Sequence, residues 1–138
     1  MSLALGLPAA AGASDATLKV ALATWSKQIA ADARSLQHSA QRRHPGRLMT
    51  TAKRFRADAL RARRALAAAS PSSARGTRAR ALALAAFARY ATVGREWALA
   101  GQARLRNQRV AAVRYARLAK NNAQKGGTLL IAAGRLLT

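Results

Sequence analysis

Apolar residues recur at steps of three and four along the stretch from Arg47 to Ala69. These steps match the turn of an α-helix, so the pattern predicts an amphipathic helix with one narrow apolar stripe. The stripe consists of Leu48, Ala52, Phe55, Ala59, Ala62, Leu66 and Ala69. A helix of this kind cannot bury its stripe alone, so we expect it to pack against partner helices.

The segment before this helix carries the same pattern and predicts a first helix over about 15–43. Ser14 is a favourable N-cap, and Asp15 places an acid in the first turn, where the helix dipole favours one. The apolar positions are Leu18, Leu22, Trp25, Ile29, Leu36 and Ala40. His44-Pro45-Gly46 then breaks the helix. The short turn predicts that the second helix, over 47–69, runs antiparallel to the first.

The segment after Ala69 begins with a linker rich in Ser, Pro and Gly over 70–77, which we expect to be flexible. A third helix over 78–100 is apolar on nearly every side, as expected of a helix inside a bundle. A turn between Gly101 and Asn107 separates it from a fourth helix over about 104–123. The sequence therefore predicts an all-α fold, an antiparallel four-helix bundle spanning 14–124. The alternative is a three-helix arrangement in which one long helix spans 78–123.

The two ends of the chain differ from this central part. Residues 1–13 are apolar and uncharged, and they suit either a disordered leader or the remnant of a signal peptide with a small-residue cleavage site at 11–13. Gly126-Gly127 is expected to end the fourth helix, which leaves 125–138 as a short apolar segment. That segment either covers the open end of the bundle or contacts a partner. No apolar run reaches the roughly 18 residues that suggest a transmembrane helix.

Charge is the strongest compositional feature: 25 Lys and Arg residues face only four Asp and Glu residues, a net charge of +21. Most of the basic side chains have no acid to pair with and must face outward. Such a field attracts polyanions, of which we consider nucleic acid, an anionic membrane surface and an acidic cell-wall polymer. All but five of the basic residues are arginine, which suits phosphate geometry. Codon bias in a GC-rich genome explains that preference equally well, but it explains the shortage of acids less readily.

The basic residues are expected to form two faces, one on the back of the second helix and one on a side of the fourth. The predicted polyanion-binding residues are Lys53, Arg54, Arg61, Arg64, Arg106, Arg109, Arg114, Arg117 and Lys120. Contacts with phosphate carry no sequence information by themselves. No recognition helix with an array of Asn or Gln is evident, so we expect binding without sequence specificity.

The residues that perform chemistry are scarce: two His, four acids and no Cys. No catalytic or phosphate-binding motif is present, so we expect neither an enzyme nor a cofactor. Asp32, Asp58 and Glu96 each lie beside the apolar stripe of a different predicted helix. We expect each to neutralise an arginine rather than to bind a metal ion. Two further hypotheses remain open: an exported, envelope-associated protein with a structural or partner-binding role, and a homo-oligomer that associates through its alanine-rich grooves.

Overall fold

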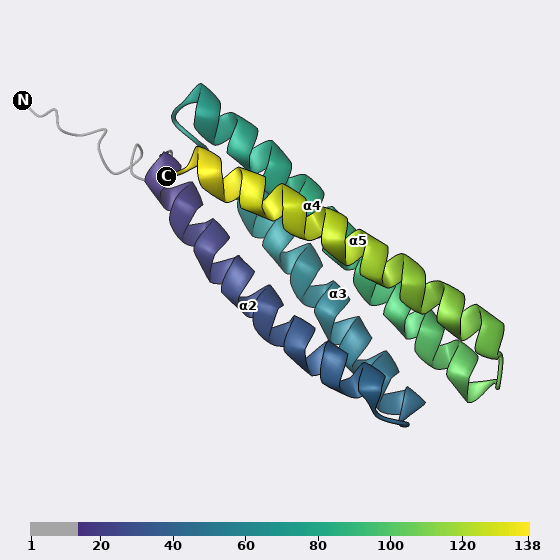
Figure 1. Cartoon of the computed structure of the whole chain (residues 1–138). Coiled ribbons are helices and arrows are strands. Elements are labelled where there is room, and N and C mark those ends of the chain that lie inside the picture. Colours follow the sequence, from purple (N-terminus) through teal and green to yellow (C-terminus); the bar gives the residue numbers. More distant parts are fainter. Residues whose placement is uncertain (1–13) are drawn as a thin grey trace, which may run out of the picture.

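The computed structural model describes residues 14–138, which form an all-α four-helix bundle with antiparallel neighbours (Figure 1). The fold class predicted from the sequence is therefore confirmed. The predictions made for residues 1–13 lie outside the described residues. The helices are α2 (Asp15–Gln41), α3 (Pro45–Ala68), α4 (Ala74–Leu105) and α5 (Arg109–Leu136).

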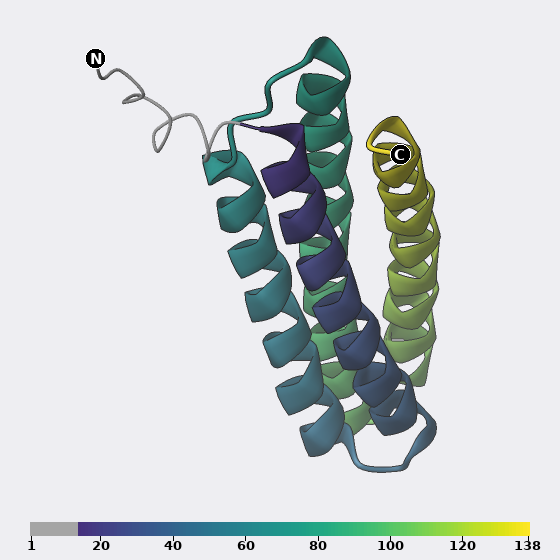
Figure 2. The same ribbon diagram turned by 90° about the vertical axis from the view of Figure 1, so that its left-hand side faces the viewer.

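Helix α4 is the central element of the bundle. It packs along most of α3 on one side and along α5 on the other, whereas α2 packs mainly on α3 and meets α4 at only a few points. The four helices lie roughly along one axis, and the C-terminus lies at the end of the bundle where α2 begins (Figures 1 and 2). The nearly continuous apolar surface of α4 follows from this position, because α3 and α5 cover it on two sides.

The core is built largely from alanine, so the helices approach one another closely. The stripe of α3 is buried from Leu48 to Leu66, with Phe55 only 2% exposed. Gly94 on α4 shows how close the α3–α4 contact is. A Cβ atom at that position would lie 2.8 Å from the Ala52 carbonyl oxygen and 2.7 Å from the Arg56 Cβ. Only glycine fits there without displacing α3.

A tight turn separates α4 from α5, so the alternative with one long helix spanning 78–123 is wrong. Asn107 has a φ of 55°, in the left-handed region that asparagine tolerates better than most residues. The Gln108 N–H donates to the Ala103 carbonyl oxygen at 2.8 Å and closes the turn. The break expected between Gly101 and Asn107 is thus present, at its C-terminal end.

Several predicted boundaries differ from the structure: α4 ends at Leu105 rather than 100, and α5 begins at Arg109 rather than about 104. Two further differences have a clear physical cause. Helix α4 begins at Ala74 rather than 78, because the Ser73 hydroxyl accepts a hydrogen bond from the Gly76 N–H and caps the helix. The linker before it is held in place, since the Asp15 carboxylate accepts hydrogen bonds from the Ser72 and Ser73 N–H groups and the Ser73 hydroxyl.

The second difference concerns the C-terminal segment 125–138, which is not separate from the fourth helix. Helix α5 continues through Gly126-Gly127 to Leu136. At Gly126 a Cβ atom would lie 3.0 Å from the ring of Tyr90. Packing of the bare helix backbone against this ring outweighs the low helix propensity of glycine. The last turns, with Ala133 buried, therefore lie along the bundle rather than across its end.

Candidate functional site

All nine predicted polyanion-binding residues are exposed, but the neighbouring helices divide them into groups with different surroundings. On α3, Arg54 and Arg61 lie toward α2, whereas Lys53 and Arg64 line hollows between α3 and α4. The sequence placed these four side chains on one cationic back. The structure separates them across the two edges of the helix.

The α2 edge of α3 contains a pair of carboxyl groups. Asp32 of α2 and Asp58 of α3 are each only 8% exposed. The Gln28 amide donates to Asp32 Oδ1 at 3.1 Å, and the Arg61 guanidinium donates to Asp58 Oδ1 at 3.2 Å. The second Asp32 oxygen, Oδ2, is buried and has no hydrogen-bond partner among residues 14–138.

These surroundings favour the protonated form of Asp32. Burial, followed by its contact with the Asp58 carboxylate, raises the pKa of Asp32 to about 6, while Gln28 and Arg54 oppose the shift. Arg54 and Arg61 therefore already offset buried negative charge. We expect them to contribute less to polyanion binding than their exposure suggests.

The expectation that every acid neutralises an arginine is only partly met. Within residues 14–138, Asp58–Arg61 is the sole ion pair closer than 4.0 Å. Glu96 of α4 accepts a hydrogen bond from the Asn122 amide of α5 at 2.7 Å, and Asn122 in turn accepts one from Arg89 at 2.9 Å. This acid is thus linked to a cation through an amide that joins α4 to α5.

Two basic hollows lie one after the other along the outer seam of α3 and α4, and together they are called the outer groove. Lys53 and Arg56 of α3 line the first hollow together with Arg95 of α4. Arg63 and Arg64, about two turns further along α3, line the second. No acid lines either part of this outer groove. The sequence analysis identified Lys53 and Arg64 but missed the other three. The signal was available in the spacing of Lys53, Arg56 and Arg63, at steps of three and seven residues, which marks one edge of the helix.

The basic residues of α5 form a second group. Arg117 and Lys120 line a hollow together with Arg104 of α4, which the sequence analysis also missed. Arg114 lies on another side of the helix, with its guanidinium carbon 6.0 Å from the centroid of the Tyr115 ring. Arg106 and Arg109 are exposed at the α4–α5 turn.

Residues 14–138 contain no cluster of metal-ligating side chains and no helix suited to crossing a membrane. No group of three or more His, Asp or Glu side chains gathers where a metal ion would bind. None of the four helices combines the length and the apolar character needed to cross a bilayer.

We find no family model, no curated protein and no solved structure that matches this chain. Its function is therefore inferred from its own geometry and charge.

Proposed function

We propose that this protein is a non-enzymatic binder of polyanions, with nucleic acid as the main ligand and no sequence specificity. The observation that carries the proposal is the outer groove between α3 and α4. It presents five cationic side chains and no acid: Lys53, Arg56, Arg63, Arg64 and Arg95. A cationic groove without internal counter-charge attracts a phosphate backbone.

The dimensions of the outer groove suit several phosphates at once. Lys53 and Arg64 are eleven residues apart, which corresponds to roughly 16 Å along a helix. Phosphates on one strand of B-DNA follow one another at about 3.4 Å along the axis, so the groove is about as long as five steps. Its side chains stand on two helices whose backbones are in close contact at Gly94. Little backbone reorganisation is therefore needed on binding.

The same features support binding without sequence specificity. Arginine and lysine contacts with phosphate fix position but do not distinguish bases. No aromatic side chain lines the outer groove, so bases have no ring there on which to stack. The basic surface of α5 adds charge on a second side of the bundle.

The test is a titration of labelled duplex DNA by fluorescence anisotropy at several salt concentrations. The unmodified chain is expected to bind with an affinity that falls steeply with salt, by about 0.9 log unit per log unit of salt for each phosphate contacted. A variant with Lys53, Arg56, Arg63 and Arg64 all changed to Ala is expected to bind more weakly and with a shallower slope.

The matched control removes the same amount of charge from other exposed positions: Lys19, Lys27, Arg34 and Lys125. If DNA is attracted only by the net charge, both variants should lose the same amount of affinity. This result would count against the outer groove as the site. Salt-independent binding, or no binding at low salt, would refute the polyanion function itself.

A further inference from the structure

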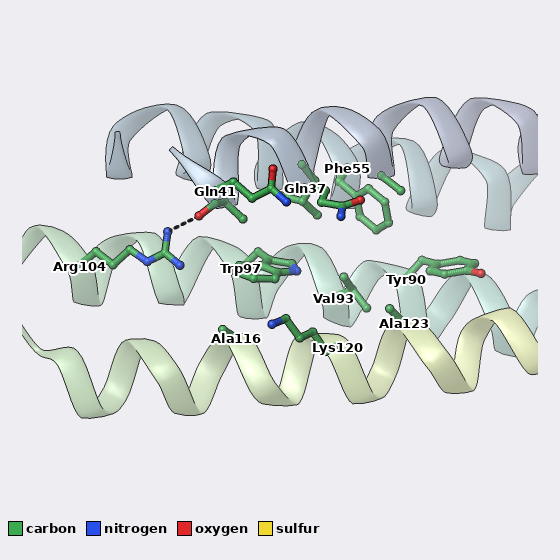
Figure 3. Close-up of a pocket in the computed structure, with 13 residues that line it drawn as sticks. Gln37, Gln41, Phe55, Tyr90, Val93, Trp97, Arg104, Ala116, Lys120 and Ala123 are labelled. Atoms are coloured by element: carbon green, nitrogen blue, oxygen red, sulfur yellow. Dashed lines mark hydrogen bonds between the residues drawn. The ribbon is translucent and has the colours of Figure 1, made fainter. Parts of the chain in front are cut away.

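A separate groove of about 440 Å³ lies between α2 and α5 (Figure 3). It is on the opposite side of α4 from the outer groove, because the α4 residues that line the two are about half a helical turn apart. Trp97, Val93 and Tyr90 of α4 form its floor with Phe55 of α3. The volume and the mostly apolar lining are typical of small-molecule sites.

The cationic side chains of this α2–α5 groove lie at one end and along its α5 wall. Arg104 lies at one end, where it donates to the Ala40 carbonyl oxygen at 3.0 Å. A guanidinium has five N–H groups, and those not used in this bond have no partner among residues 14–138. The Lys120 side chain extends over the groove from α5. Arg117 lines the hollow next to it, and no acid lines the groove or this hollow.

We propose that the α2–α5 groove binds one molecule of a free fatty acid. The carboxylate contacts Arg104 at the end of the groove, Lys120 adds attraction from the α5 wall, and the acyl chain lies over Trp97 toward Tyr90. Charge complementarity selects this occupant, because a purely apolar ligand would leave the two cations unpaired and a small polar anion would leave the aromatic floor uncovered. This inference does not depend on the proposed nucleic-acid binding, whose main site is the outer groove on the other side of α4.

The length of the groove agrees with such a ligand. Tyr90 and Arg104 are fourteen residues apart on α4, roughly 21 Å along the helix. One leaflet of a bilayer, and thus one acyl chain, is about half of the roughly 30 Å hydrocarbon core. An acyl chain and its carboxylate therefore fit between these two residues. Gln37 and Gln41 stand on the α2 side of the groove and leave its apolar floor open (Figure 3).

The experiment uses the full chain with Trp25→Phe, which leaves Trp97 as the only tryptophan. Stearate brominated in the middle of its chain is added below its micelle concentration, and quenching of Trp97 fluorescence is recorded. We expect saturable quenching with one molecule bound per chain. The methyl ester of the same acid, which lacks the charge, should bind more weakly.

Two charge reversals on α5 separate a specific site from general attraction. Lys120→Glu places an anion in the groove and is expected to weaken binding by at least about tenfold. Lys125→Glu makes the same change on an exposed part of α5 that does not line the groove, and its affinity should stay within about twofold of the parent. Circular dichroism is used to check that both variants fold.

Three outcomes would overturn the proposal: no saturable quenching, equal binding of acid and ester, or equal effects of the two reversals. Light scattering during the titration could give a fourth outcome of this kind. A dimer that dissociates as the acid binds would assign the groove to a second copy of the chain.

Discussion

The carboxyl pair at the α2–α3 interface makes a quantitative prediction about stability. Asp32 has an ordinary pKa of 3.8, and its environment in the folded protein raises the pKa to about 6. Between these two values the folded state holds a proton that the unfolded state has released. The contribution of Asp32 to stability is therefore complete below about pH 4 and is lost as the pH rises through about 6.

The magnitude follows from the size of the shift. A difference of about two pKa units corresponds to about 3 kcal/mol at 1.36 kcal/mol per unit. The pair lies at the seam between two helices, where water screens part of the interaction, so we expect about 1–2 kcal/mol. Asp32→Asn removes the charge and keeps an amide that can donate to the Asp58 carboxylate. This variant should be more stable than the parent by that amount at about pH 8 and equally stable at about pH 4.

The assay is urea unfolding followed by circular dichroism at both pH values. Asp58→Asn also removes the repulsion between the two carboxylates, but it leaves Arg61 without its partner. Its gain in stability at about pH 8 should therefore be smaller than that of Asp32→Asn. The double variant should gain less than the sum of the two, because the residues are in contact. The reasoning is refuted if Asp32→Asn is less stable than the parent at about pH 8, or if its urea midpoint changes equally at both pH values.

Three further predictions concern single positions, each checked by urea unfolding. Asp15→Asn should lower the midpoint near neutral pH but not at about pH 2. The Ser73 hydroxyl and the Ser72 N–H lower the pKa of Asp15, so its stabilisation is lost as the pH falls through that value; an equal loss at both pH values would contradict this. Gly94→Ala should destabilise the protein by about 1–3 kcal/mol through overlap with α3, whereas Gly134→Ala, where no atom lies within 4 Å of the new Cβ, should stabilise it by up to about 1 kcal/mol. Asn107→Ala should cost about 1 kcal/mol because alanine disfavours a φ of 55°, and Asn107→Gly should be nearly neutral; an equal loss in both would exclude backbone strain as the cause.

Periodicity alone predicted much of this fold. The stripe from Leu48 to Leu66 is buried as expected, because the spacing of apolar residues along one helix determines which face can leave water. The turn near Asn107 was also predicted, because residues that tolerate unusual backbone angles often lie where a helix ends. The continuation of α5 through Gly126 was not found. It depends on the ring of Tyr90, a residue 36 positions away in the sequence.

The basic surfaces were predicted less well, and the reason is geometric. A helical pattern shows which residues lie opposite the core, but it does not show which neighbouring helix covers each edge. Arg54 and Lys53 are adjacent in sequence, yet one acts on the buried Asp32 of α2 and the other lines the groove with α4. Which residues surround each cation of α3 depends on how α2 and α4 pack against that helix.

The order of packing, in which α2 rests almost entirely on α3, has a consequence for how the molecule opens. Helices α3, α4 and α5 share their largest contacts through α4, so α2 can separate while those three stay together. Its amide protons should accordingly exchange with solvent through a local opening that costs less free energy than global unfolding. Because α2 forms one wall of the groove above Trp97, each such opening also uncovers that floor. The most loosely packed helix is thus also a movable wall of the groove.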